Sequence, residues 1–287
     1  MSNPIVPREK LDFGLDGDIP RYWFEGDVFK SRYFDAMSTI FPEGERYFIS
    51  CVRDFRDAIT DPKLREDVKH FMRQEGQHGI VHGQYNDRLK AQGIDVDRLE
   101  AIEHHLLFNI LRKHLPAKVT LADTAAAEHL TATMAHMLFE HGDTLAKVDP
   151  RMRAMYAWHA MEEVEHKAVA FDVMQKVAKV GYLRRCLALL LVTLGFNIHV
   201  LLTTRYMLKS DGFKPWQRWG MFAKGMWWLY RPGGLYSKML GPYLQYFKPG
   251  FHPWQQGQLK SYDLWLDTFN RTGDPIAAGN ALQTLHA

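Results

Sequence analysis

Two stretches of the chain place ionisable side chains at positions that a helix would bury. Residues 63–91 carry apolar side chains at alternating four- and three-residue steps, the spacing of one helix face, and residues 150–177 repeat this pattern. In each stretch, three consecutive positions of the face are taken by glutamate or histidine. These polar triplets are Glu75, His78 and His82, and His159, Glu163 and His166. We therefore expect both triplets to point into the interior of a helical protein.

Burial of these groups limits what the chain can fold into. An isolated buried carboxylate costs several kcal/mol even after relaxation, so such groups occur in cores only when they are paired or bound to metal. Lysine and arginine are almost absent from the two faces. We therefore expect bound metal ions to supply the positive charge. A hydrogen-bonded network without metal is the less favoured alternative, because so many like charges would repel one another.

Two further helical stretches each add one glutamate on an apolar face. They are residues 42–60, with Glu45, and residues 121–138, with Glu128. At about 1.5 Å per residue, the chain rises roughly 21 Å from Glu45 to the next turn and returns roughly 18 Å to Glu75. Glu128 and Glu163 are also equally far from the turn between them. The four glutamates are therefore expected at one level of two antiparallel helix pairs, joined by a long crossover over residues 92–119.

One glutamate from each of two helices, with Glu-x-x-His from each of two others, is the ligand pattern of di-iron carboxylate bundles. Over about residues 40–180 the chain resembles the ferritin-like superfamily, which implies an all-α fold built on a four-helix bundle with one long crossover. Three motifs, FPEGERYF, RQEGQHGIVHGQY and WHAMEEVEHKAVAFDV, begin at residues 41, 73 and 158. They resemble more closely a bacterial family of predicted metal-dependent hydrolases.

The superfamily resemblance implies a set of metal ligands, residue by residue. The six matching positions are Glu45, Glu75, His78, Glu128, Glu163 and His166. His159 stands one turn before Glu163, similar to the extra histidine ligand of di-iron arylamine oxygenases, and we expect it to be a seventh ligand. His82 is expected either to bind metal or to orient a ligand. Glu162 and Glu165 lie off the buried face, so we expect them to be solvated or to support a ligand from behind, with Glu162 as a further candidate ligand.

Carboxylate and imidazole ligands without thiolate suit iron or manganese. The resemblance implies two iron ions, with manganese or a mixed pair as alternatives. Our first functional hypothesis is an oxidoreductase that uses O2 and an unidentified electron donor to oxidise an apolar small molecule, such as a lipid or acyl chain. Two alternatives are kept: a binuclear metal-dependent hydrolase, and an iron-binding or ferroxidase protein.

The C-terminal third is basic and aromatic. Residues 176–260 hold thirteen Lys or Arg and one acidic residue, although the formal net charge of the 287-residue chain is only +3. Residues 186–204 carry no formal charge, which leaves three alternatives: a helix that spans a membrane, lies in its surface or is buried in protein. Five of the eight tryptophans follow within residues 214–254. Tryptophans among cations are typical of an anionic membrane surface, and a packed aromatic layer or dimer surface is the alternative. We expect no nucleic-acid binding, because no nucleic-acid motif accompanies them.

These patterns predict three parts: an N-terminal extension (1–42) that packs on the bundle, a dimetal four-helix bundle (43–180) and additional C-terminal helices (181–287). Two cysteines, Cys51 and Cys186, are too few for a disulfide framework. The first twenty residues contain no apolar run of the kind found in secretory signals. We expect a cytoplasmic protein, and leave open peripheral binding at the inner face of the membrane and formation of a homodimer.

Overall fold

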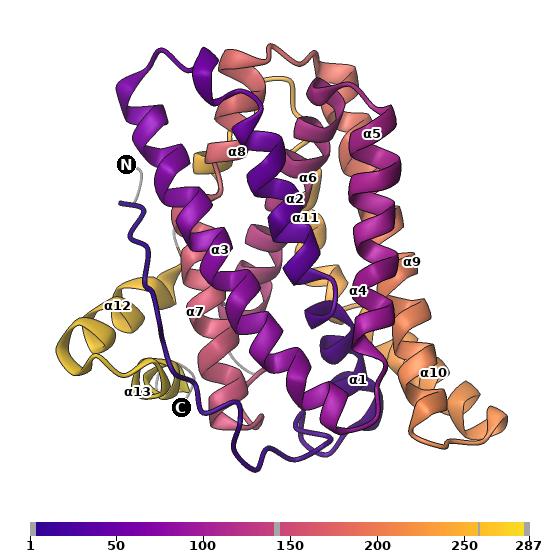
Figure 1. Ribbon diagram of the computed structural model, residues 1–287. Coiled ribbons are helices and arrows are strands. Elements are labelled where there is room, and N and C mark those ends of the chain that lie inside the picture. Colours follow the sequence, from indigo (N-terminus) through magenta and orange to yellow (C-terminus); the bar gives the residue numbers. More distant parts are fainter. Residues whose placement is uncertain (1–3, 141–143, 258, 284–287) are drawn as a thin grey trace.

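The computed structural model describes residues 4–140, 144–257 and 259–283, and the regular elements in these ranges are all helical (Figure 1). The prediction of an all-α fold is confirmed. The α-helices are α1 (Val28–Ser38), α2 (Phe41–Arg53), α3 (Pro62–Ala91), α4 (Val96–His104), α5 (Arg112–His114), α6 (Ala117–Glu140), α7 (Pro150–His166), α8 (Val169–Asp172), α9 (Tyr182–Ser210), α10 (Pro215–Tyr230), α11 (Leu240–Gln245), α12 (Lys260–Thr272) and α13 (Pro275–Ala281).

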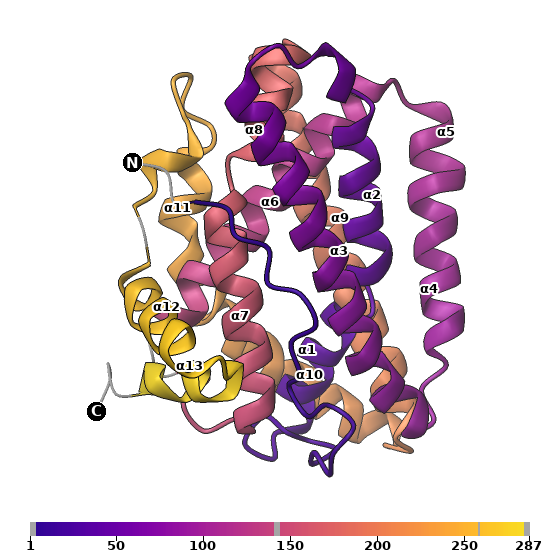
Figure 2. The ribbon, with the colours of Figure 1, turned by 60° about the vertical axis from the view of Figure 1, so that its left-hand side comes forward.

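Four helices surround the polar triplets. α2 packs against α3, α6 packs against α7, and α2 also contacts α6. The crossover between the two pairs is helical as well: α4, a π-helical segment (His105–Leu111) and α5 form one column along the outside of α2 (Figure 2). Each of the four helices can therefore turn one face towards the same interior space.

Helices α3 and α7 begin in the same way. Asp61 precedes Pro62 and Asp149 precedes Pro150, and each aspartate accepts a hydrogen bond from the backbone N–H two residues further on. An aspartate cap satisfies a free backbone donor, and proline is well suited to the first helical position because it has no N–H to satisfy. The starting points of α3 and α7 fix the level at which their glutamates lie.

The other boundaries depart from the predicted ranges at two points. α2 ends at Arg53, and a short 3-10 turn (Arg56–Ala58) leads into α3, so the predicted stretch over residues 42–60 is not one helix. The last bundle helix is interrupted after His166 and continues as α8 and a π-helical segment (Val173–Val177). Both departures lie beyond the polar residues and leave these on regular helix.

α7 is the central helix of the fold. Every residue from Met152 to His166 is buried, because α6, α13 and the N-terminal extension cover the helix on different sides. Glu162 and Glu165 are therefore inside the protein. Of the two alternatives for them, solvation is wrong, and a position that supports a ligand from behind is left. An amphipathic pattern identifies one buried face of a helix and is silent about helices that are covered all round.

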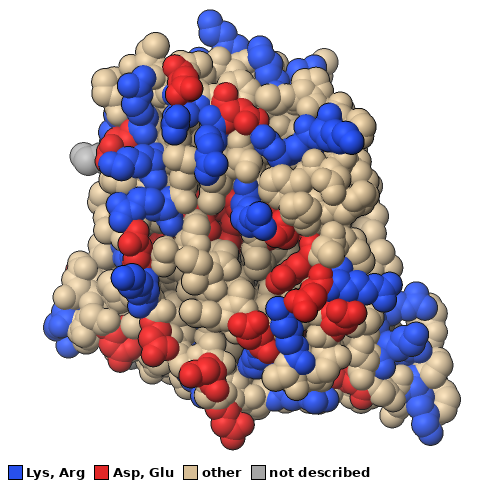
Figure 3. All heavy atoms as spheres, viewed as in Figure 1, with Lys and Arg blue, Asp and Glu red and all other residues tan. Residues whose placement is uncertain are grey.

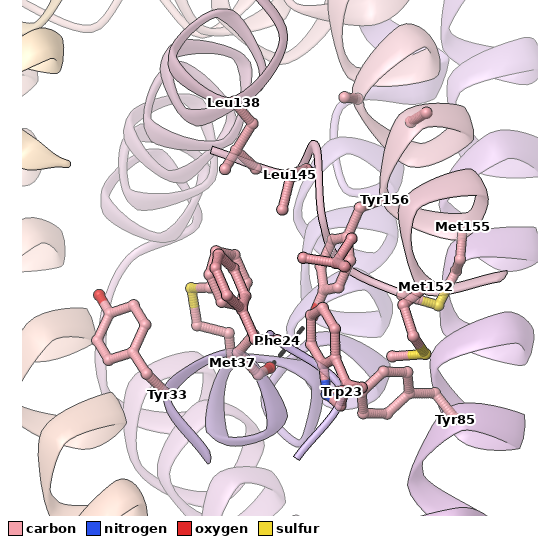
Figure 4. Packing of buried hydrophobic residues seen from close by; sticks show 14 of the residues in the cluster. Trp23, Phe24, Tyr33, Met37, Tyr85, Leu138, Leu145, Met152, Met155 and Tyr156 are labelled. Atoms are coloured by element: carbon pink, nitrogen blue, oxygen red, sulfur yellow. Dashed lines mark hydrogen bonds between the residues drawn. The ribbon is translucent and has the colours of Figure 1, made fainter. Parts of the chain in front are cut away.

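The core near the start of α7 is aromatic. Trp23, which precedes α1, stacks on Tyr156 with ring centroids 5.9 Å apart, and Phe24 stacks on Phe34 at 5.3 Å. Figure 4 shows Trp23, Phe24, Tyr156 and Met37 gathered together in this region. The segment before α1 is thus part of the main core.

α9 has one covered and one exposed face. Val200, Met207 and Leu208 are buried where α9 packs on α1 and α6. On the other side seven large apolar residues are 49–80 % exposed: Leu183, Leu187, Leu190, Leu191, Leu194, Ile198 and Leu202. The alternative that residues 186–204 are buried within the chain is therefore wrong. Among the described helices, α9 is the one long and apolar enough to cross a membrane, a criterion that buried helices of soluble proteins also meet.

The contact between α10 and α1 can be tested with two glycines of α10. A Cβ atom on Gly225 would lie 2.2–2.4 Å from the ring of Phe29, whereas one on Gly220 would meet open space. We expect Gly225→Ala to lower the free energy of unfolding by about 1–3 kcal/mol, because the ring or the helix must move. Gly220→Ala should raise it by up to ~1 kcal/mol, since alanine favours the helix. Urea unfolding followed by circular dichroism measures both, and equal effects would contradict this packing.

Candidate metal centre

The structure brings all seven predicted ligands together in the interior, and we call them the buried cluster. Three sets of side chains each have ligand atoms that lie within 4.8 Å of one another. The sets are Glu45, His78 and His159; Glu75, Glu128 and His166; and Glu75, His78 and Glu163. The first two sets share no residue, so they could hold two separate cations. The third set joins them, which places Glu75, His78 and Glu163 between the two positions.

The inner atoms of the buried cluster are not satisfied by the protein. Among the described residues, both carboxylate oxygens of Glu45, Glu75 and Glu128 are buried without a hydrogen-bond partner. The same holds for Nδ1 of His78 and Nε2 of His166. Because most buried polar groups in folded proteins have a partner, this group of oxygen and nitrogen donors needs an explanation. A pair of cations would satisfy it, so the residues present fit a bound metal centre.

Each of the three histidine rings also makes a hydrogen bond on the side that faces away from the other ligands. These outer contacts join His78 Nε2 to Glu162 Oε2 at 3.2 Å, His166 Nδ1 to Gln74 Oε1 at 2.9 Å, and His159 Nδ1 to His82 Nε2 at 2.8 Å. A metal-binding histidine usually has its second nitrogen hydrogen-bonded in this way, which fixes the orientation of the ring. His82 and Glu162 thus lie behind the ligands, and neither belongs to the three sets.

Arg8 of the N-terminal extension adds positive charge behind the buried cluster. Its guanidinium lies 3.1 Å from Glu162 and 2.7 Å from Glu165, and all three side chains are buried. Glu165 also accepts hydrogen bonds from Gln74 and Tyr262. The start of the chain therefore supplies a cation to two buried glutamates that lie off the predicted inner face of α7. Sequence analysis missed Arg8, because no local pattern marks it as reaching α7.

Without bound cations, the buried cluster can reduce its negative charge only by holding protons. Burial, together with the charge of Glu75, raises the pKa of Glu128 to about 8, and burial also raises the pKa of Glu45 well above its usual value. Burial lowers the pKa of His78, but the hydrogen bond with Glu162 and the negative charge of nearby Glu75 outweigh this and raise the pKa to about 10. A metal ion must displace such protons, so its affinity should increase as the pH rises towards these values.

A cavity of about 50 Å³ adjoins the buried cluster, and we call it the inner cavity. His159 and Glu163 form its wall on the metal side, where Thr131 donates a hydrogen bond to Glu163. Apart from these residues and three tyrosines, the lining is apolar and includes Met37, Phe41, Met134 and Leu138. A molecule that reaches the centre through this cavity must therefore be largely apolar.

A family model described as predicted metal-dependent hydrolase matches residues 7–257. The matched range contains the whole buried cluster together with Arg8, and the family is the one that the three sequence motifs resemble. No curated protein and no solved structure matches the chain. The wider assignment to the ferritin-like superfamily stays a prediction. The arrangement agrees with it in one respect, because the candidate metal ligands come from four helices.

The ligand assignment is tested by removing a carboxylate between the two cation positions. Glu75→Ala and Glu163→Ala should each bind fewer metal ions than the wild type, because each removes a side chain of the joining set. Metal analysis of the purified proteins gives the stoichiometry, and circular dichroism shows whether the helices persist. His104→Ala, at a half-exposed side chain outside the cluster, is the control and should keep the full content. Wild-type metal content in both glutamate variants would contradict the assignment.

Proposed function

The chain belongs to the family of predicted metal-dependent hydrolases, and on this premise we propose that it is a hydrolase with a binuclear metal centre held by the buried cluster. The observation that carries the proposal is the set of unpartnered carboxylate and imidazole atoms beside the inner cavity. Two cations bound there would act as Lewis acids and lower the pKa of water, which is the chemistry that ester or phosphoester hydrolysis needs.

The protein's own residues position and shield the reaction. The outer contacts of the three histidines hold the rings in place. His159 and Glu163, whose Nε2 and Oε1 atoms are 3.0 Å apart, are the members of the buried cluster that line the inner cavity. A substrate would therefore meet the centre on their side. The apolar walls exclude water and favour a substrate with an apolar group next to the bond that is cleaved.

An O2-dependent oxidoreductase is the second candidate, and the donor set favours it. Four carboxylates and three imidazoles without thiolate suit iron or manganese, the metals used for oxygen chemistry in proteins. Such an enzyme would oxidise an apolar substrate and would need an external electron donor. An iron-binding or ferroxidase role is less well supported, because iron ions and O2 do not need an apolar cavity for an organic substrate.

Anaerobic metal loading separates the two candidates. We expect protein loaded with Fe(II), Mn(II) or Zn(II) to hydrolyse p-nitrophenyl acyl esters or phosphoesters without O2. Glu163→Ala should lower this rate by more than the roughly 10–100-fold typical of residues that only support a ligand. His104→Ala serves again as the control. If no loaded form hydrolyses these compounds, and the iron form changes its absorbance only when O2 is admitted, the oxidoreductase replaces the hydrolase.

We also propose that α9 and α10 bind peripherally to an anionic membrane surface. Trp216, Trp219 and Trp227 are 64–72 % exposed on α10, and Figure 3 shows Lys and Arg on the corner of the molecule that α10 forms. Exposed tryptophans among cations, together with the exposed leucines of α9, support contact with lipid head groups. Trp228 has a different role, because it packs on Phe24 and Tyr33.

Vesicle flotation tests the membrane proposal. Each Lys or Arg near an anionic surface contributes about 1 kcal/mol, and this attraction fades within about 8 Å at physiological salt. We therefore expect binding to anionic vesicles that weakens with salt, and little binding to neutral vesicles. Replacing Trp216, Trp219 and Trp227 with alanine should reduce the binding that survives high salt. Replacing Ile80 and Ile102, similarly exposed on α3 and α4, should not. No recovery with anionic vesicles at low salt would end the proposal.

A further inference from the structure

A second cavity, of about 360 Å³, lies next to the inner cavity, and we call it the outer cavity. Its walls come from α6, α9, the last residue of α10 (Tyr230), α11 and the 3-10 segment Tyr236–Met239. Met134 and Tyr236 line both cavities. The inner cavity ends at His159 and Glu163, so the buried cluster, the inner cavity and the outer cavity follow one another.

The outer cavity offers an apolar surface to a ligand. None of its described lining residues is Lys, Arg, Asp or Glu. Several of its polar side chains already have partners within the protein. Asn197 accepts a hydrogen bond from Tyr230 and donates one to the carbonyl of Thr193, while Ser237 donates to the carbonyl of Gly234. A charged or strongly polar ligand would therefore lose its hydration without gaining equivalent bonds.

The outer cavity lies beside the exposed face of α9. Thr193 and Asn197 are in its wall, each three residues after a leucine, Leu190 and Leu194, that is more than half exposed. Residues three apart are neighbours on a helix surface. Leu240, also in the wall, is 56 % exposed. An apolar molecule on the surface of α9 is thus one helical turn away from the cavity.

Two adaptable side chains separate the cavities. The hydroxyl of Tyr236 hydrogen-bonds with that of Tyr33 on α1, and the Tyr236 ring stacks on Tyr230 with centroids 5.2 Å apart. Met134 stands with Tyr236 at the shared wall, and its unbranched side chain can change rotamer at low cost. Loss of one hydrogen bond and rotation of two side chains would join the two spaces.

We propose that the substrate is a molecule with an unbranched hydrocarbon chain, an acyl or alkyl chain, that enters from the α9 side. The chain occupies the outer cavity and passes between Met134 and Tyr236, and one end reaches the buried cluster at His159 and Glu163. A charged substrate would not use this path, because its walls are apolar. A compact apolar molecule could occupy the outer cavity but would not extend from there to the buried cluster. The inference rests on the proposed function for the reaction at the cluster, whereas the binding path stands on the cavities alone.

Binding to the full-length chain after metal removal tests the path. The probe is N-phenyl-1-naphthylamine, whose fluorescence rises in apolar sites, displaced by 1-alkanols of four to about fourteen carbons. Affinity should rise about fourfold per methylene, or about 0.8 kcal/mol, until the path is full. Thr193→Phe, which fills the outer cavity, should weaken binding of the longest alkanols at least tenfold. Leu183→Phe, at the exposed start of the same helix, is the control and should leave binding unchanged.

Variants of Met134 and Tyr236 test whether the two cavities can join. Met134→Trp, or Met134→Phe if the larger side chain disturbs the helices, should make the affinity level off at a shorter alkanol. Tyr236→Phe, which removes the hydrogen bond with Tyr33 and keeps the ring, should speed probe entry in stopped-flow measurements. A chain-length series that is the same in wild type, Thr193→Phe and the Met134 variants would overturn the inference.

The outcomes for binding and for catalysis are separable. Hydrolysis of short esters by a protein that shows no dependence on alkanol length would overturn the chain-binding path and leave the proposed function in place. Binding that follows the predicted chain-length pattern, in a protein that hydrolyses none of the offered bonds, would overturn the hydrolase proposal and leave the path.

Discussion

Four glutamate side chains in one buried space are the constraint on which the rest of this structure depends. Carboxylates repel one another more strongly in a protein interior than in water, so they can share that space only with compensating cations or protons. Each comes from a different helix among α2, α3, α6 and α7, and so the four helices must bring them to the same level. The capped starts of α3 and α7 set that level for two of the four helices.

Two further buried cations lie just outside the buried cluster, and segments far from it in the sequence contribute to their contacts. Arg8 pairs with both Glu162 and Glu165, and its single positive charge offsets one of their two negative charges. Lys167, directly after the last histidine of the cluster, is fully buried and donates hydrogen bonds to the carbonyls of Gln256 and Gly257 at 3.0 and 2.8 Å. The family match begins one residue before Arg8 and ends at Gly257, so it includes the residues that make both sets of contacts.

Sequence reasoning succeeded where burial is periodic. Every position predicted on the inner face of α3, from Leu64 to Leu89, is buried. Glu75 and His78 of its polar triplet belong to the buried cluster, and His82 lies behind His159. It could not find Arg8, because an extended segment has no helical period and its partners lie more than 150 residues away. It could not decide the environment of α9 either, since an apolar run shows that a helix avoids water without showing which face the protein covers. The two cavities could not be predicted either. Each is a space left between side chains of several helices, and the pattern of a single helix does not show how those side chains pack.

The contacts of Arg8 with α7 and of Lys167 with Gln256 and Gly257 form at different times during synthesis. Ribosomes add about 5–20 residues per second, so on the order of tens of seconds pass between the appearance of Arg8 and that of Gly257. Until then the end of α7 lacks the carbonyls that hold Lys167. The nascent chain would expose the glutamates and histidines of an unfinished centre to whichever ion is most abundant around it. The four glutamates and three histidines are therefore all synthesised well before the last of these contacts of Lys167 can form, which happens only when translation has nearly ended.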